Sequence, residues 1–408
     1  MKLLYLHQYF KFPSEEGGTR SYDLATSFVK KGYDVVVVSA TSDEKYRSNK
    51  RWTIIDRDSF KINYIYLPYG NHLSYIQRAV VFFKFLWFSA FRLLKIKADI
   101  VLATSTPLTI GIPVLIKKWF GRTPFVFEVR DVWPEAVIAI GAVKNRLLQK
   151  TLYSLEEVIY KNASAIVPLS SDMQNSIVSR YPQFAAKSSI VIENISEVNR
   201  FQNVEQKIDI KEIIGFQPRF SILYAGTFGK VNGIDKVIEL AQKTISIDEK
   251  LVYILIGSGA EKENVIHLAQ STGVLNKNVF ILNPVSKGEL PLWYTGVSMG
   301  SSFVIDIKEL WANSANKFFD TLAAGKPILI NHEGWQAHVI RDRNVGYVLP
   351  AIISEKEIEE FIRYTYNTDL IQQQQKNAIE IARGRYSLGR AVEKYMQVLK
   401  KIEKTVIV

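Results

Sequence analysis

The chain has no cysteine, which excludes a disulfide framework, a thiolate metal site and a cysteine nucleophile. Its five histidines show no ligand spacing such as HxxxH. The sequence also lacks a Walker loop, a GxSxG elbow and an HExxH motif, so three further enzyme classes are excluded. We therefore expect neither a metal nor another cofactor.

The chain also has no apolar run of about eighteen residues, the length that a membrane-spanning helix needs. Lys84 and Arg92 interrupt the most apolar stretch, residues 79–96. The N-terminal MKLLYL is too short for the core of a signal peptide, and no cleavage site follows it. The sequence thus predicts a cytoplasmic protein.

Acidic residues are scarce between residues 79 and 122, where seven lysines and arginines meet one acid, Asp99. The whole chain carries a net charge of +12, which favours an anionic partner. Because aromatic and aliphatic residues are interleaved with these cations, an anionic membrane surface fits better than nucleic acid. The alternative is a pair of core helices with solvated lysines. The expected membrane face, which would keep the protein peripheral on the inner side of the membrane, comprises Lys84, Trp87, Phe88, Arg92, Lys95, Lys117, Lys118 and Trp119.

A chain of 408 residues is too long for one ordinary core, so we expect two domains. Short apolar and β-branched runs alternate with helical patterns, and this alternation is typical of parallel, doubly wound sheets. Strands are expected at residues 2–7, 35–39, 62–67, 100–103, 125–129, 165–168 and 189–192, and again at 220–224, 251–256, 279–282, 297–304 and 328–330.

A polar stretch, residues 193–206, separates the two halves of this pattern. We therefore predict an α/β protein with two Rossmann-like domains, residues 1–198 and 199–385. The C-terminal segment 386–408 repeats apolar residues at helical spacing and is expected to pack back toward the first domain. A ligand would lie between the domains, at the carboxyl ends of their strands.

Residues 313–327 join a polar loop to an apolar helix and then to a buried-strand pattern. The loop carries Ser314, Asn316 and Lys317, and the helix carries one acid, Asp320. Backbone N–H groups at a helix start, together with a lysine, can hold a phosphate diester. Asp320, one turn further along, could take the hydroxyls of an attached ribose. An ordinary loop–helix–strand unit with a solvated start fits the same residues, and the pattern alone leaves both interpretations open.

Three glycine-containing loops follow expected strands. Glycine lets a ligand approach the backbone closely, and the start of a following helix favours negative charge. The loop at 226–233 does not have GxGxxG spacing, and any of the three could be a structural turn. The candidates for a diphosphate cradle are Gly18, Gly226, Thr227, Gly229, Asn232, Gly257 and Gly259, with Lys230 as a neighbouring cation.

The segment 128–135 places four charges within eight residues, directly after an expected buried strand. Charges at this position are costly unless they bind a ligand or pair with each other. The functional interpretation makes Asp131 or Glu135 a contact for a sugar or an acceptor hydroxyl. The structural interpretation is an ion pair of Arg130 with Asp131 or Glu135 that shapes the loop.

With these motifs the chain resembles glycosyltransferases of the GT-B architecture, in particular the large retaining family 4, over nearly its whole length. The most specific matches are RDVWPE, residues 130–135, and NKFFDTLAAGKP, residues 316–327. Within the family the chain is similar to the bacterial branch that builds surface polysaccharides, including transferases for N-acetyl-fucosamine and for colanic acid units.

The resemblance implies that Lys230 and Lys317 stabilise the leaving phosphate without a metal and that Asp320 binds ribose. The same donor pocket would be lined by Gly18, Ser314 and Asn316. A nucleotide sugar, with UDP as the expected nucleotide, would be the donor.

For the sugar and the acceptor, the resemblance points to Asp131, with Arg130 and Glu135 beside it. One position departs from the family pattern, because Ala312 stands where the family usually has its first glutamate. Glu309, three residues earlier, is the candidate substitute.

The resemblance implies a retaining glycosyltransferase that moves a sugar from a nucleotide-diphosphate sugar to a polyprenyl-diphosphate-linked glycan of an O-antigen or capsule. Retention without an evident covalent nucleophile implies attack on the face from which the leaving group departs. Two alternatives stay open. One is a nucleotide-sugar 2-epimerase on the same scaffold, and the other is a non-catalytic protein that binds a nucleotide sugar or a glycan.

Overall fold

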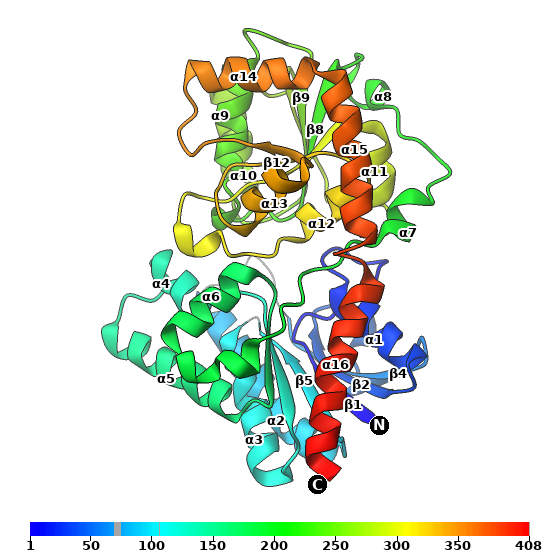
Figure 1. Cartoon of the computed structure of the whole chain (residues 1–408), viewed down its shortest axis with the longest axis vertical. Coiled ribbons are helices and arrows are strands. Elements are labelled where there is room, and N and C mark those ends of the chain that lie inside the picture. Colours follow the sequence, from blue (N-terminus) through cyan, green and yellow to red (C-terminus); the bar gives the residue numbers. More distant parts are fainter. Residues whose placement is uncertain (69–74, 106, 408) are drawn as a thin grey trace.

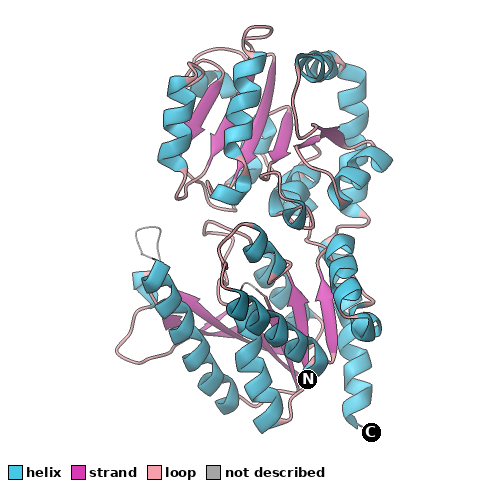
Figure 2. Ribbon diagram, turned by 90° about the vertical axis from the view of Figure 1, so that its left-hand side faces the viewer, coloured by secondary structure: helices cyan, strands magenta, loops and turns pink. Residues whose placement is uncertain are grey.

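The computed structural model describes residues 1–68, 75–105 and 107–407, and it shows two α/β domains, one above the other in Figure 1. Each domain has a central sheet with helices packed beside its strands (Figure 2). The two Rossmann-like domains that the strand and helix patterns predict are therefore confirmed.

The N-terminal domain contains a seven-stranded sheet with the order β3-β4-β2-β1-β5-β6-β7, parallel except for β3 at the edge. Its strands are β1 (Lys2–Leu6), β2 (Asp34–Thr41), β3 (Thr53–Arg57), β4 (Phe60–Tyr66), β5 (Ile100–Thr104), β6 (Phe125–Val129) and β7 (Ala165–Pro168). Its helices are α1 (Arg20–Lys30), α2 (Tyr75–Lys95), α3 (Gly111–Gly121), α4 (Glu135–Ala139), α5 (Arg146–Asn162) and α6 (Ser171–Arg180).

The C-terminal domain contains a six-stranded parallel sheet with the order β10-β9-β8-β11-β12-β13. Its strands are β8 (Phe220–Ala225), β9 (Leu251–Ile256), β10 (Val279–Leu282), β11 (Met299–Ser302), β12 (Ile328–Ile330) and β13 (Gly346–Val348). The remaining helices are α7 (Val198–Gln202), α8 (Ile210–Ile214), α9 (Ile234–Thr244), α10 (Lys262–Ser271), α11 (Leu290–Gly296), α12 (Asn316–Ala323), α13 (Trp335–Arg343), α14 (Glu355–Tyr366), α15 (Thr368–Arg383) and α16 (Leu388–Ile407).

The first sheet buries both of its faces, because side chains alternate from one face to the other along each strand. Leu3 and Tyr5 pack on the face covered by α1 and α16, whereas Leu4 and Leu6 pack on the face covered by α2, α3 and α5. The C-terminal helix α16 lies along the N-terminal domain (Figure 1). It thus completes the core of that domain, with Tyr395 among its buried residues.

Residues 189–192 do not form the strand that the sequence predicts. The 3-10 helix Pro182–Ser188 precedes them, and Ile192 N makes one hydrogen bond to Pro168 O, 3.0 Å, in place of a ladder. Ile192 is buried, so the apolar pattern reflects core packing without strand pairing. The sequence analysis also missed β3 and β13, because β3 is an edge strand with several exposed residues and β13 has only three residues.

The chain crosses between the domains twice, near residues 193–197 and 384–387, and the two crossings run side by side. Ser196 N donates to Tyr386 O at 2.8 Å, and Ser196 forms an isolated bridge with Ser387. The Glu193 carboxylate accepts hydrogen bonds from Arg385 Nη2 at 2.8 Å and from Lys394 Nζ at 3.0 Å. These contacts join both crossings to α16.

The outer surface of α2 and α3 carries exposed aromatic side chains. Phe83 and Trp87 on α2 are 70% and 64% exposed, and Phe120 at the end of α3 is 79% exposed. Lys84 and Lys95 are exposed beside them. Further exposed apolar residues of these two helices are Val80, Phe91, Leu94 and Trp119. The spacing of three to four residues along α2 places its members on one face of the helix.

Some residues of the predicted membrane face lie inside the domain instead. Lys117 is buried and its Nζ donates to Ile96 O at 2.8 Å, so the prediction is wrong for this residue. Arg92 is half-buried and its Nε donates to Asn63 Oδ1 at 3.0 Å, and Phe88 packs against the core. The sequence shows which residues of a helix are positively charged. It does not show which of these cations finds a hydrogen-bond partner inside the domain.

The guanidinium of Arg20, at the start of α1, is buried in a polar network. Its Nε lies 3.3 Å from Glu128 Oε2, and its Nη1 and Nη2 donate to Glu193 O at 2.6 Å and Ile192 O at 3.0 Å. The Tyr395 hydroxyl also donates to the Glu128 carboxylate. Burial opposes ionisation of Glu128, but the neighbouring arginine charges outweigh it, and the pKa of Glu128 lies below its ordinary value.

Substituting Glu128→Gln leaves the Arg20 charge buried without a carboxylate, and this should lower the free energy of unfolding by about 3–5 kcal/mol. The matched control is Glu333→Gln, because Glu333 pairs with Arg341 at the surface, where an ion pair contributes about 0–1 kcal/mol. Urea unfolding followed by circular dichroism measures both variants. Equal losses in the two would contradict this role of Glu128.

Candidate functional site

A cavity of about 510 Å³ lies between the two domains, where the carboxyl ends of strands from both sheets face each other. Its N-terminal wall includes Gly17 and Gly18 from the loop after β1, and Arg130 and Asp131 from the loop after β6. Its C-terminal wall consists of the loops that follow β8, β9, β10 and β11 and the start of α12. Doubly wound sheets place their ligands at this edge.

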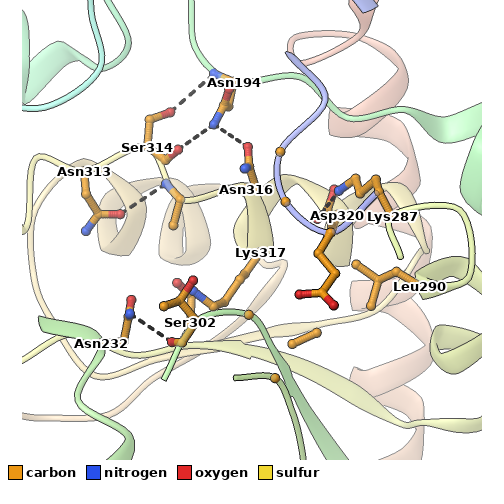
Figure 3. Close-up of a pocket in the computed structure, with 18 of the residues that line it drawn as sticks. Asn194, Asn232, Lys287, Leu290, Ser302, Asn313, Ser314, Asn316, Lys317 and Asp320 are labelled. Atoms are coloured by element: carbon orange, nitrogen blue, oxygen red, sulfur yellow. Dashed lines mark hydrogen bonds and ion pairs between the residues drawn. The ribbon is translucent and has the colours of Figure 1, made fainter. Parts of the chain in front are cut away.

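The glycine loop of the N-terminal domain touches the start of α12. A Cβ atom on Gly18 would lie 2.3 Å from Asn316 Nδ2, so any larger residue would displace the Asn316 side chain. Asn194, in the first crossing, holds the same turn, because its Nδ2 donates to Ser314 O at 2.6 Å and to Asn316 Oδ1 at 2.7 Å (Figure 3). The polar loop that begins α12 is thus fixed against the other domain.

Lys317, in the first turn of α12, extends along the cavity wall. Its Nζ lies 4.8 Å from the centre of the Tyr224 ring. Gly226, with a φ of +154°, leaves room for it, because a Cβ atom there would lie 2.7 Å from Lys317 Cε. Desolvation lowers the pKa of Lys317 to about 8, and the charge of Asp320 acts in the opposite direction. No carboxylate of the described residues forms an ion pair with Lys317, so an anion in the cavity would meet a desolvated, uncompensated cation.

Asp320 lies one turn further along α12 and also lines the cavity. Its carboxylate forms a buried ion pair with Lys287, which sequence analysis missed (Figure 3). The available signal was Ser286-Lys287-Gly288, a lysine between small residues shortly after the expected strand 279–282. Asn194 was missed as well, although the polar stretch 193–206 contains it.

The glycine loops after β8 and β9 pack against each other. A Cβ atom on Gly257 would lie 1.9 Å from Gly226 O, and one on Gly259 would lie 2.3 Å from Phe228 O. Of the predicted cradle, the residues that line the cavity are Gly18, Gly226, Thr227, Asn232 and Gly257. Gly229 and Gly259 lie outside the lining, so Gly259 serves the contact between the two loops.

Lys230 is not among the residues that line the cavity. Its side chain is exposed on the 3-10 helix Lys230–Asn232, whereas Val231 and Asn232 of the same turn face the cavity. The structure therefore does not bring Lys230 and Lys317 together on one wall. The role of Lys230 at the leaving phosphate stays a prediction.

Glu135 of the charged segment is held inside the N-terminal domain. It forms an ion pair with Arg180, and Ser176 Oγ donates to its Oε2 at 2.7 Å. The structure thus gives Glu135 a partner from α6 in place of the Arg130 pair considered from the sequence, and Glu135 does not line the cavity. Its expected contact with a sugar or an acceptor is not supported.

Arg130 and Asp131, in contrast, both reach the cavity. The Arg130 backbone N–H donates to Ser105 Oγ at 2.9 Å, which fixes the loop after β6. One guanidinium nitrogen of Arg130 lies 3.5 Å from His7 Nε2, and burial together with this arginine charge lowers the pKa of His7 well below its ordinary value. A neutral His7 leaves the Arg130 charge available to the cavity.

The departure at Ala312 has a structural counterpart. Ala312 packs in a small apolar cluster with Val132, Leu169 and Met173 of the N-terminal domain. Glu309 is exposed on the short 3-10 helix Lys308–Leu310 and is not among the lining residues. The structure therefore does not support Glu309 as a substitute for the missing glutamate.

The charged side chains of the cavity are Arg130, Lys287 and Lys317 together with Glu16, Asp131 and Asp320. Because Lys287 is paired with Asp320, the cations left for an anionic ligand are Lys317 and Arg130. Within the described parts of the chain, no three histidine, aspartate or glutamate side chains lie close enough to hold a metal ion.

Both halves of the chain match known protein families. The model of Glycosyltransferase Family 4 matches residues 17–197, and that of Glycosyl transferases group 1 matches residues 206–385. A putative colanic acid biosynthesis glycosyl transferase of Escherichia coli is 26% identical over 238 residues, which are 55% of this chain and 54% of that protein. The chain thus aligns with about half the length of this curated relative.

Solved structures of the same architecture match nearly the whole chain. Sucrose-phosphate synthase from Thermosynechococcus elongatus superposes with a TM-score of 0.73 at 14% identity over 99% of both chains. Anabaena HepE in complex with UDP and glucose superposes with a TM-score of 0.69 at 14% identity, over 98% of this chain and 100% of that chain. These likenesses show that the chain has the GT-B fold, and the two family models, which together span nearly the whole chain, show that it belongs to glycosyltransferase family 4.

Proposed function

We propose that the protein is a retaining glycosyltransferase that transfers a sugar from a UDP-sugar, or another nucleotide-diphosphate sugar, to a polyprenyl-diphosphate-linked glycan. The observation that carries this proposal is the desolvated Lys317 at the start of α12, facing a cavity between the domains. The complex of HepE with UDP and glucose supports a nucleotide-sugar donor. The relative named for colanic acid biosynthesis supports a surface polysaccharide, such as an O-antigen or capsule, as the product. An N-acetylated deoxyhexosamine is our candidate for the transferred sugar.

The physical task of the site is to stabilise a leaving diphosphate, whose charge grows as the bond from the sugar C1 to the phosphate oxygen breaks. The Lys317 ammonium and the backbone N–H groups at the start of α12, which lines the cavity, would stabilise that charge. In a retaining transfer, the acceptor oxygen bonds to C1 on the face that the phosphate leaves, and the phosphate oxygen takes the acceptor proton. Asp131, across the cavity, is our candidate contact for the transferred sugar or the acceptor hydroxyl.

Lys230 enters this mechanism through closure of the cavity. Its turn already lines the cavity through Val231 and Asn232, and its side chain is long and exposed. Closure of the domains over a bound donor, with the exposed Lys230 side chain turned toward the phosphates, would bring its ammonium near them and exclude water, as closing lids and domains do in many enzymes.

The acceptor places the reaction at a membrane, and the outer surface of the N-terminal domain supports such a location. The exposed aromatic face of α2 and α3 combines apolar area with exposed lysines, which suits an anionic lipid surface. The start of α5, which packs on the same face of the sheet as α2 and α3, also carries exposed leucines, with Leu147 74% exposed and Leu148 beside it, a feature that the sequence did not single out. In the described residues, no helix combines the length and the apolarity needed to span a bilayer. Peripheral contact from the cytoplasmic side, through the exposed aromatic face of α2 and α3, is our proposal.

The nucleotide and the reaction can be tested directly with the purified chain. UDP or GDP should raise its melting temperature, because a ligand that binds only the folded form stabilises it. Incubation with the matching nucleotide sugar and a polyprenyl-diphosphate-linked acceptor should then yield a longer glycan with the anomeric configuration of the donor. An epimerised nucleotide sugar formed without acceptor would favour the epimerase, and binding without any turnover would favour a non-catalytic role.

Lys317 gives a second prediction, because its pKa of about 8 makes the cation sensitive to alkaline pH. The charged form prevails below pH 8 and is lost above it, so kcat/KM for the donor should fall as the pH rises through 8. In Lys317→Arg the guanidinium stays charged and this fall should be absent. Lys317→Ala should lower turnover about a hundredfold or more at every pH.

The control for these variants is Lys262→Ala, a lysine of the same domain whose Nζ contacts Asn283 outside the cavity. It should keep the turnover and the pH profile of the unmodified enzyme. An unchanged pH profile in Lys317→Arg would show that another group causes the alkaline fall.

The membrane proposal predicts that Phe83→Glu together with Trp87→Glu weakens binding to vesicles of phosphatidylglycerol and phosphatidylcholine at least tenfold. Each exposed aromatic side chain contributes about 1.5–3 kcal/mol when it is fully buried in an apolar environment. Cosedimentation with the vesicles measures the binding. The control is Ile352→Glu, which changes a residue 83% exposed on the C-terminal domain. Equal binding of the two variants would contradict docking through α2.

A further inference from the structure

Lys287 occupies an unusual place for a lysine. It lies in the loop between β10 and α11 and lines the cavity, yet its side chain and that of Asp320 are each only 8% exposed. Lysine is almost never fully buried unless it is paired. Its Nζ contacts the Asp320 Oδ2 oxygen, and it also lies 5.4 Å from the centre of the Phe201 ring. Figure 3 shows the Lys287 nitrogen turned toward the Asp320 carboxylate.

The backbone of the same loop is attached to the N-terminal domain. Lys287 N donates to Glu15 O at 3.1 Å, and Gly288 N donates to Pro13 O at 2.8 Å. These acceptors belong to the loop that continues into Gly17 and Gly18 at the cavity. Lys287 therefore links the two domains. Its main chain is hydrogen-bonded to the glycine loop of the N-terminal domain, and its ammonium is paired with Asp320 of the C-terminal domain.

The pair has two physical effects on a ligand in the cavity. First, one ionic contact to Asp320 Oδ2 restricts the rotation of the carboxylate about its last bond, so its second oxygen keeps a fixed direction. Second, the ammonium cancels a negative charge that would otherwise repel a diphosphate bound at Lys317, one turn away on α12. The side chain of an aspartate is shorter than that of a glutamate. Whether the Asp320 carboxylate reaches a ligand therefore depends more on how Lys287 orients it.

We infer that Lys287 is a positioning residue that holds the Asp320 carboxylate for the ribose hydroxyls and so lets the enzyme distinguish ribonucleotides from deoxyribonucleotides. This inference rests on the proposed function and on the ribose contact that the family resemblance implies for Asp320. A carboxylate oxygen that accepts a hydrogen bond from a sugar hydroxyl disfavours the analogue without that hydroxyl, because this oxygen is then left without a hydrogen bond in a desolvated site.

The test compares UDP with 2′-deoxy-UDP, and GDP with 2′-deoxy-GDP, by titration calorimetry on the full chain. The unmodified protein should bind one ribonucleotide about tenfold or more tightly than its deoxy analogue. In Lys287→Met this ratio should fall to about one, because the Asp320 carboxylate loses its direction. Lys287→Arg, which keeps the ion pair, and Lys262→Met, a lysine outside the cavity, should keep the ratio.

A purely structural role of Lys287 would weaken both nucleotides equally and leave the ratio unchanged in Lys287→Met, and that result would overturn the inference alone. If Lys287→Met does not fold, Lys287→Gln takes its place, and a ratio equal to that of the unmodified protein would again overturn the inference. Equal binding of both analogues by the unmodified protein would overturn the ribose role of Asp320 and with it the inference. Failure to bind either UDP or GDP would overturn the proposed function itself.

Discussion

The buried guanidinium of Arg20 holds together the segments on which the cavity depends. It contacts Glu128, two residues before Arg130, and the carbonyl groups of residues 192 and 193 at the first crossing between the domains. Tyr395 brings α16 to the same carboxylate. Because an unpaired charge would be costly at this depth, these segments cannot move apart independently. The glycine loop, the charged loop after β6 and the crossing therefore keep one mutual arrangement around the cavity.

Local sequence patterns were sufficient for the sheets and for one wall of the cavity. Most expected strands form, because β-branched and apolar runs bounded by turns report strands that are buried on both faces. The structure also brings Ser314, Asn316, Lys317 and Asp320 to the cavity. Their positions follow from the start of one helix, whose geometry places residues three to four apart on the same side. For the start of α12, the local sequence is therefore sufficient to predict which side chains face the cavity.

Sequence patterns could not supply partners that are distant along the chain. Lys287 and Asp320 are 33 positions apart, and Arg20 and Glu128 are 108 positions apart, so only the tertiary fold brings each pair together. The same limit explains Glu135, which is engaged by α6, and Lys117, whose ammonium finds the carbonyl group of Ile96. From a charged side chain we can predict that a counter-charge, a hydrogen-bond partner or solvent stabilises the charge. The tertiary fold determines whether a ligand, solvent or another residue does so.

The paired crossings have a mechanical consequence. Because α1 and α16 both pack on the N-terminal domain, the C-terminal domain is an inserted lobe (Figure 1). It is attached through two adjacent segments of backbone, which are joined where Ser196 N donates to Tyr386 O. A lobe attached in this way can rock about its attachment but cannot spin freely. Displacement grows with distance from that axis, so the hydrogen bonds of Asn194, which lies in the first crossing, would be strained least when the lobe rocks.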